Sequence, residues 1–229
     1  MAGTVAPNIV VNNRLMLYLD AANTISYPFP YTGSSWFDLT GNLRNATLIN
    51  GPTFSSANSG SIVFDGVNDF GRLPEFNGLQ PSAELTLEVW FKSSGSNSRI
   101  QGLLYLNYGT GLRLQPNGAI HTRINSAGSL QQFTTTSTYF NNLWNQVILT
   151  INSNTAILYV NSIIIDQYSI VYDGSSPFDT SIGGVGTDSN DGVDRGLYGN
   201  LSIARVYNKV LTQTEILQNY NATKTRFGL

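Results

Sequence analysis

The segment Gly199–Tyr220 reads GNLSIARVYNKVLTQTEILQNY and carries the pattern that decides the fold. Its first part, Leu201–Tyr207, is rich in β-branched and aromatic residues and apolar on nearly both faces, which is typical of a strand inside a sheet. Thr212 lies three residues before Glu215, the spacing of a capping box at a helix start. The next apolar residues share one helical face: Ile216, Leu217 and Tyr220. The segment predicts an interior strand followed by a short helix that plugs an open end of a β structure.

The chain before this segment shows the alternation of β-strands. In Leu85–Lys92 every second residue is apolar, so one face of the strand belongs in a core. Trp90 lies on the other face, between Glu88 and Lys92, where it is available to line a cleft. Further strand patterns recur at short spacing: Gly102–Asn107, Gly111–Gln115, Ala119–Asn125 and Gln131–Thr136. We therefore expect an all-β fold, a two-sheet antiparallel jelly-roll β-sandwich with a short C-terminal helix.

The size and composition of the chain fit one such sandwich. The chain has 229 residues, of which 41% are apolar, and no Pro/Ser-rich linker or charge run divides it. We expect a single domain over residues 14–229, preceded by a polar, irregular arm at residues 1–13. The sequence leaves open whether this arm is loose or docks to a partner.

The charge pattern excludes several classes of protein. Only 11% of the residues are charged, the formal net charge is −2, and no basic cluster is present, which argues against a nucleic-acid partner. The absence of cysteine rules out disulfides and thiolate metal sites. No apolar run approaches the roughly 20 residues of a membrane span. The N-terminal MAGTVAPN lacks the features of a signal peptide, so we expect neither a membrane segment nor a signal peptide.

The closing segment resembles that of concanavalin A-like lectin/glucanase domains of the laminin-G-like kind, in which a central strand precedes a Leu-Ser/Thr-x-x-Glu-Ile helix. The matching positions are Leu201, Ala204, Arg205, Val206, Tyr207, Asn208, Leu211, Thr212, Glu215 and Ile216. Other similar elements are the strand Leu15–Asp20, the turn Trp36–Asn42, the Asp-Gly turn after Phe64 and the hairpin Trp144–Asn161, where Ser162 replaces the expected Gly. The resemblance implies a jelly roll with Trp36 and Trp144 in its core.

The catalytic groups of such glucanases are missing, and we expect a non-enzyme. Glu84 and Glu88 share a strand face, but four residues along a strand separate them by roughly 13 Å. This separation is too long for the carboxylate pair of a glycosidase. His121 is the only histidine and no Gly-x-Ser-x-Gly motif is present, so we expect it to be a surface residue. A glucanase would require an acid pair assembled from distant strands.

A calcium site is one interpretation of the loop at residues 183–196. Calcium prefers hard oxygen ligands from flexible loops. Such ligands come from Asp188, Asn190, Asp191 and Asp194. The resemblance adds that many relatives bind calcium at the rim of the sandwich, although the spacing is not that of an EF-hand. The alternative is a solvated loop of Asp-Gly turns. Asp65 and Asp69 form a second, weaker candidate of the same kind.

A sugar site needs an aromatic platform and hydrogen-bonding groups around it. Candidate platform residues are Trp90, Tyr105 and Tyr108, and the polar candidates on neighbouring predicted strands are Asn107, Arg113 and Arg123. The alternative is that these aromatic residues pack within the fold, as most strand aromatics do.

The composition and the lack of a secretion signal resemble laminin-G-like proteins of tailed phages, which decorate the capsid or form fibres. The resemblance implies a non-catalytic, lectin-like protein on the virion surface that binds a cell-surface glycan and contacts other virion proteins, with a homo-oligomer compatible with that setting. The alternative is a purely structural decoration protein that binds no sugar, and the least favoured is a glucanase-type hydrolase.

Overall fold

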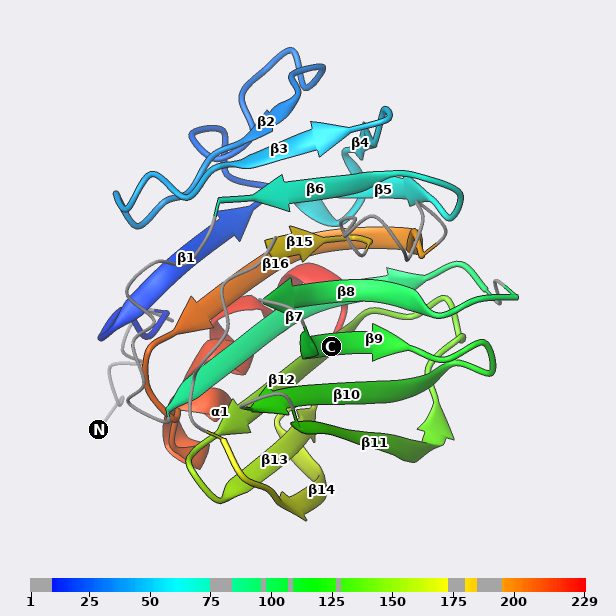
Figure 1. Cartoon of the computed structure of the whole chain (residues 1–229). Helices are drawn as coiled ribbons and strands as arrows, with labels where there is room; N and C mark the ends of the chain where they lie inside the picture. The colour runs from blue at the N-terminus through cyan, green and yellow to red at the C-terminus, as the bar shows by residue number, and fades with distance from the viewer. Residues whose placement is uncertain are drawn as a thin grey trace.

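The computed structural model describes residues 10–74, 84–95, 98–106, 109–126, 129–172, 180–184 and 195–229. These residues form two stacked antiparallel sheets and one C-terminal helix (Figure 1). The predicted fold class, an all-β sandwich with a short C-terminal helix, is therefore confirmed.

The first sheet has eight strands. In spatial order these are β14 (Ile163–Ser169), β13 (Thr155–Val160), β12 (Asn145–Ile151), β7 (Leu85–Ser93), β16 (Tyr198–Tyr207), β5 (Ser61–Asp65) and β4 (Thr53–Ser55), with β1 (Leu15–Asp20) paired to β16 off this path. The short 3-10 turn η1 (Ala57–Ser59) follows β4.

The second sheet also has eight strands. In spatial order these are β11 (Ser129–Thr138), β10 (Ala119–Ser126), β9 (Thr110–Leu114), β8 (Gln101–Leu106), β15 (Thr180–Ile182), β6 (Phe70–Leu73), β3 (Ala46–Ile49) and β2 (Ser35–Trp36). Residues near in space thus come from distant parts of the chain, since β15 lies between β8 and β6.

Strand β16 is the interior strand that its composition predicts. It pairs with β7 on one side and with β5 and β1 on the other. Because of a register shift between Leu201 and Ile203, these two side chains point to opposite faces of the sheet. Leu201 and Val206 belong to the main core, whereas Ile203 and Tyr207 belong to clusters on the outer face of the sheet. Both faces are apolar because both faces are covered.

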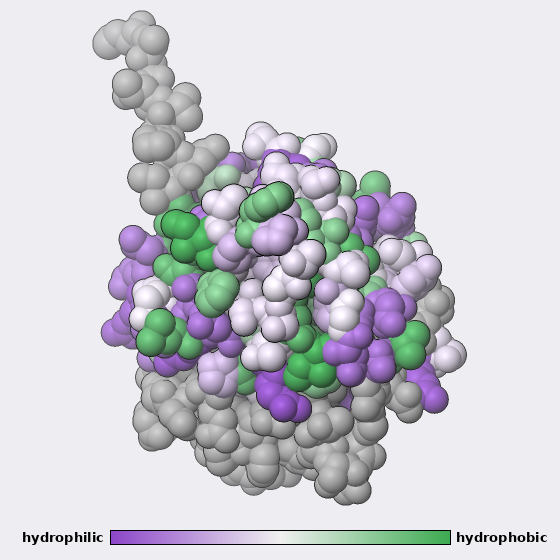
Figure 2. Space-filling model, turned by 90° about the horizontal axis from the view of Figure 1, so that it is seen from above, coloured by the Kyte–Doolittle hydropathy of each residue, from purple (hydrophilic) through white to green (hydrophobic). Residues whose placement is uncertain are grey.

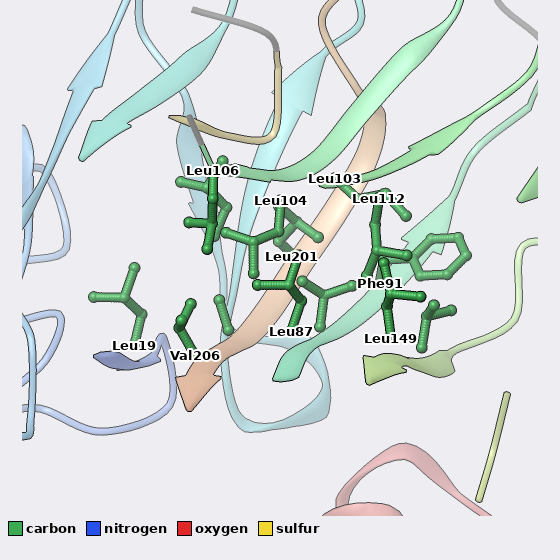
Figure 3. Packing of buried hydrophobic residues seen from close by; sticks show 14 of the residues in the cluster. Leu19, Leu87, Phe91, Leu103, Leu104, Leu106, Leu112, Leu149, Leu201 and Val206 are labelled. Atoms are coloured by element: carbon green, nitrogen blue, oxygen red, sulfur yellow. The ribbon is translucent and has the colours of Figure 1, made fainter. Parts of the chain in front are cut away.

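The main core fills the space between the two sheets. Figure 3 shows Leu104, Leu106 and Leu112 of the second sheet facing Leu87 and Leu201 of the first. All five side chains are at most 2% exposed. Trp36 is also fully buried in this core, as the resemblance implies. Trp144 is buried too, but in the outer cluster of the first sheet rather than between the sheets.

The C-terminal segment lies against the outer face of the first sheet. Helix α1 (Gln213–Thr223) begins at Thr212, whose side chain accepts from the Glu215 N–H while the Glu215 side chain accepts from the Thr212 N–H, so the predicted capping box is confirmed. The 3-10 turn η3 (Lys224–Phe227) continues the chain. The helix does not plug an open end of the sandwich as predicted, because Ile216 packs on Tyr207 and its neighbours across the face of the sheet.

The structure also describes the turn at Ser162 and the end of the N-terminal arm. The hairpin between β13 and β14 keeps its left-handed turn without the expected glycine, since Asn161 and Ser162 have φ values of 50° and 66°. The end of the arm that the structure describes is attached to the helix: Val11 is 7% exposed, and its N–H donates to Asn219 Oδ1 at 2.9 Å.

Hydropathy was compared for the helices and for one end of the molecule. Among the described residues, no helix combines the length and the apolar character that crossing a bilayer requires. Figure 2 shows the end of the molecule that is uppermost in Figure 1, where apolar residues are interspersed with polar ones.

Candidate functional site

The outer face of the first sheet is filled by the protein itself. Arg205 Nη1 on β16 donates to Glu88 Oε1 on β7 at 2.6 Å, and both side chains are 0% exposed. Asn219 of α1 donates to the second Glu88 oxygen at 2.8 Å, and Gln146 of β12 donates to the first at 2.8 Å. Glu88 is thus fully used in joining the helix to the sheet and is not a catalytic acid on a cleft.

Trp90 lies on this same covered face, and its assignment to an exposed sugar platform is wrong. Its ring is 0% exposed and stacks on Phe227 at 4.2 Å and on Tyr220 at 5.8 Å between ring centroids. Strand alternation placed Trp90 correctly away from the main core. The error arose because the sequence does not show that the C-terminal segment folds back over that face.

The outer face of the second sheet carries a different set of side chains. Leu112 and Leu114 of β9 point into the core, so Arg113 between them points outward. On β10, Ile120 and Ile124 belong to the core in the same way. His121 and Arg123, which alternate with the core residues of β10, share the outer face with Arg113.

The strand register brings these side chains together. Arg113 is directly opposite His121, and Arg123 is opposite Gly111, which is itself opposite Tyr105 of β8. Gly111 leaves room for the tyrosine ring, because a Cβ at that position would lie 2.6 Å from Tyr105 Cδ2. Three predicted site residues are therefore neighbours on one face: Tyr105, Arg113 and Arg123. We call this surface, with His121 and Arg195, the arginine face.

Arg113 is nearly buried on this face. Its side chain is 2% exposed, its Cζ lies 4.5 Å from the centroid of the Tyr105 ring, and its Nη2 donates to the Tyr105 hydroxyl. Its Nε is buried without a hydrogen-bond partner, and so is the Nε of Arg123. The described residues provide no carboxylate for either guanidinium; the ion pairs among them join Arg205 to Glu88, Lys209 to Glu215 and Arg226 to Asp20.

The charges of Arg113 and Arg123 are therefore not neutralised by the described side chains. Burial, together with the positive charges of Arg123 and Arg195, lowers the pKa of Arg113 to about 10, against the opposing effect of Tyr105. Burial raises the pKa of Tyr105, although the three arginines act in the opposite direction. At neutral pH the guanidinium of Arg113 is charged and the Tyr105 hydroxyl is neutral, so the face presents hydrogen-bond donors and positive charge.

His121 and Arg195 were not predicted as members of this site. His121 was expected on the surface but is 6% exposed; its Nδ1 lies 2.9 Å from Thr134 Oγ1 and its Nε2 lies 3.2 Å from Gln132 Oε1. Burial lowers its pKa, and the positive charges of the nearby arginines act in the same direction. Strand alternation could have grouped His121 with Arg123. Arg195 reaches the site from a loop, where its carbonyl accepts from the Gly102 N–H at 3.0 Å, and no sequence pattern indicated this.

The remaining predicted site residues are not part of this geometry. Asn107 and Tyr108 lie outside the described residues, as do the calcium candidates Asp188, Asn190, Asp191 and Asp194. Within the described part of the chain, no three His, Cys, Asp or Glu residues are grouped to hold a metal ion.

The second calcium candidate forms a turn that is held by its own backbone. Asp65 Oδ1 accepts from the N–H groups of Val67 and Asn68 at 2.8 and 3.3 Å. Asp69 Oδ2 accepts from the Asp65 N–H at 3.1 Å. These are the bonds that aspartates make when they stabilise a turn.

The fold and this face define the chain as a two-sheet jelly-roll protein with a polar, arginine-bearing sheet surface. Residues 64–217 match the family described as the concanavalin A-like lectin/glucanases superfamily. This match spans more than half of the sequence, and the chain belongs to that superfamily. A search of the curated proteins gave no significant match.

Solved structures with the same fold include proteins of several kinds. The binding domain of Paraclostridial Mosquitocidal Protein 1 is 16% identical with a TM-score of 0.71, over 92% of this chain and 52% of that chain. Trypanosoma rangeli sialidase in complex with sialic acid is 16% identical with a TM-score of 0.69, over 95% and 34%. Domain 4 of AbnA, an extracellular arabinanase from Geobacillus stearothermophilus, in complex with arabinotriose, is 16% identical with a TM-score of 0.66, over 90% and 98%.

These likenesses differ in how much of each neighbour they cover. The chain spans about half of the toxin domain and about a third of the sialidase, but nearly all of the arabinanase domain. At 16% identity the likeness shows the shared fold alone.

Proposed function

We propose that this protein is a non-catalytic, lectin-like module that binds a saccharide on the arginine face of its second sheet. The observation that carries the proposal is the pair Arg113 and Arg123, whose Nε atoms are buried without hydrogen-bond partners on that face. Buried polar groups are normally hydrogen-bonded, and each exception calls for an explanation, of which a functional role is one. The arabinanase domain of the same fold and nearly the same length, solved with arabinotriose, supports a saccharide as the ligand.

The chemistry of the face favours recognition by hydrogen bonds. Arg113 covers the Tyr105 ring, which is only 5% exposed, so this ring is not an open platform for a sugar. Guanidinium groups offer up to five N–H donors in a fixed geometry, which suits the oxygens of a saccharide. Glu88, the strand acid considered for a glycosidase pair, is held by Arg205 and is not available as a catalytic acid.

A binding assay with matched variants tests this proposal. Arg113→Met and Arg123→Met should each abolish or strongly weaken binding on a glycan array. Arg72→Gln is the control, because Arg72 is an exposed arginine on β6 of the same sheet. It lies on the same face as Tyr105, since both residues pair with Ser181 of β15. Equal signals from all four proteins would place binding elsewhere, and release of reducing sugar from β-glucan would show an enzyme.

For the biological setting we propose the virion surface. There the protein would attach a phage to cell-surface glycans and contact other virion proteins. A homo-oligomer is compatible with this role. The resemblance to laminin-G-like phage proteins supports this setting. Mass spectrometry of purified particles tests it, because a free lectin would be absent from them. Presence in particles together with silence on the glycan array would favour the alternative, a structural decoration protein.

Calcium remains a separate proposal that rests on the sequence. Asp188, Asn190, Asp191 and Asp194 supply the oxygen ligands that calcium prefers. A ligand that binds only the native state raises its melting temperature. Calcium should therefore raise Tm in the wild type and not in Asp191→Ala; an equal rise in both proteins, or none in either, would count against these ligands.

A further inference from the structure

We propose that the arginine face is an anion site, and that the saccharide it takes is acidic, with its carboxylate or sulfate group held by Arg113 and Arg123. This inference rests on the proposed function and names the class of ligand. A neutral sugar needs only hydrogen-bond donors and acceptors, whereas the positive charges of Arg113 and Arg123 favour a ligand that carries a negative charge.

The first step is the burial of an unpaired charge. Arg113 is 2% exposed, and among the described residues its side chain makes one polar contact, with the neutral hydroxyl of Tyr105. A buried charge is unfavourable unless it is paired and hydrogen-bonded. The guanidinium therefore gains more from an arriving anion than an exposed, hydrated arginine would, because most of its water has already been removed.

The second step is the convergence of like charges. Arg113 and Arg123 lie on adjacent strands, and because Arg113 is opposite His121, Arg123 is its diagonal neighbour two residues further along β10. Diagonal neighbours on antiparallel strands are about 7–8 Å apart, within reach of long side chains. Both guanidinium groups can thus approach one anionic group that lies between them. Arg195 is close enough to act electrostatically on both Tyr105 and Arg113.

The third step is the absence of an opposing charge among the described neighbours. Among the described residues, the cations that act on Arg113 are Arg123 and Arg195, and those that act on Tyr105 are Arg113, Arg123 and Arg195. His121 occupies the row beside Arg113, and because burial lowers its pKa it is neutral at pH 7. The described side chains around the site therefore repel cations and leave an anion uncontested.

Titration calorimetry at low salt tests this inference with defined probes. The acidic probes are tetragalacturonate and sialyllactose, which carry carboxylates, and a heparin-derived tetrasaccharide, which carries sulfates; the neutral probes are lactose and a galactan tetrasaccharide. At least one acidic probe should bind at least tenfold tighter than the neutral probes. The difference should shrink as salt rises, because salt screens the attraction between a charged probe and the half-buried Arg123.

Two variants and one control locate the anion. Arg113→Met and Arg123→Gln should each reduce affinity for the acidic probe at least tenfold, and by a larger factor than they reduce any weak binding of the neutral probes. Arg72→Gln removes the same charge from the same sheet face, four strands from Arg123 in the spatial order, and should change affinity less than twofold. Arg123 is half-buried, so its variant keeps the test valid if Arg113→Met does not fold.

The outcomes separate this inference from the proposed function. Neutral probes that bind as tightly as acidic ones, with loss in the arginine variants, would overturn the acidic ligand and leave the lectin function standing. Acidic binding that survives both variants would overturn the site. No binding to any saccharide would overturn both. Free inorganic sulfate that competes as effectively as the tetrasaccharides would also overturn the inference, because the site would then bind small anions only.

Discussion

Two buried arginines in this protein have nearly the same local geometry and opposite electrostatic surroundings. Arg205, on the covered face of the first sheet, has its Cζ 4.7 Å from the Tyr18 ring, and Arg113, on the second sheet, has its Cζ 4.5 Å from the Tyr105 ring. Arg205 is paired with Glu88 at 2.6 Å, whereas no described carboxylate pairs with Arg113.

The difference in partners explains the opposite pKa shifts. Burial alone would lower the pKa of Arg205, but the Glu88 carboxylate, with smaller contributions from Tyr18 and Tyr207, raises it above its ordinary value. Burial lowers the pKa of Arg113 to about 10 because no such carboxylate opposes it. A buried arginine with a carboxylate partner thus joins two strands, whereas Arg113 keeps a charge that no described carboxylate neutralises.

Glu88→Gln should produce the largest loss of stability. It leaves Arg205 charged and buried without its counter-ion, which costs about 3–5 kcal/mol for a pair of this kind. Urea unfolding followed by circular dichroism measures the change. Glu84→Gln is the control, because Glu84 lies just before β7 and is exposed, so this change should alter the free energy of unfolding by less than about 0.5 kcal/mol. A small effect of Glu88→Gln would remove the contrast between the two arginines.

Phe227→Ala tests the cover over the first sheet. Phe227 is 7% exposed, stacks on Trp90 and packs at a tilt against Trp144, so truncation should destabilise the protein by about 3 kcal/mol. Saccharide binding by the remaining folded protein should not change, because Phe227 packs on the first sheet and the arginine face belongs to the second. Leu229→Ala, at a position 46% exposed, serves as the control. Loss of binding at full stability would show that the two faces are coupled.

Arg113→Met should have a much smaller effect on stability than Glu88→Gln. It removes an unpaired buried charge but also leaves the Tyr105 hydroxyl without its donor, so the two effects oppose each other. The free energy of unfolding should change by at most about 1 kcal/mol, in either direction. Urea unfolding of the ligand-free protein measures it. A loss of about 3 kcal/mol or more would indicate that Arg113 is structural like Arg205.

The smallest expected effect is the pH dependence at His121. Because the folded-state pKa of His121 lies below its ordinary value, the unfolded chain binds more protons just below pH 6.5. Stability from this group is complete above pH 6.5, falls as the pH drops toward the lowered pKa, and stops falling below it. Since His121 is the only histidine, His121→Gln should remove this slope in unfolding titrations. An unchanged slope would assign it to other groups.

The sequence by itself determined the sandwich and its interior strand. Alternation in Leu85–Lys92 assigned the correct face to the main core, and the composition of Leu201–Tyr207 and the capping box at Thr212 placed the last strand and helix. These features depend on contacts between residues near in sequence or on the two-residue alternation of apolar residues, and both can be seen in one amino-acid sequence.

Tertiary contacts decide which side chains meet on the outer face of each sheet. Trp90 and Tyr105 both alternate outward from the main core, but the C-terminal segment covers the first and Arg113 lies beside the second. Arg195 joins the arginine face from a loop distant in sequence. Such contacts depend on strand order and on the path of the chain over a sheet, and a period of two residues records neither.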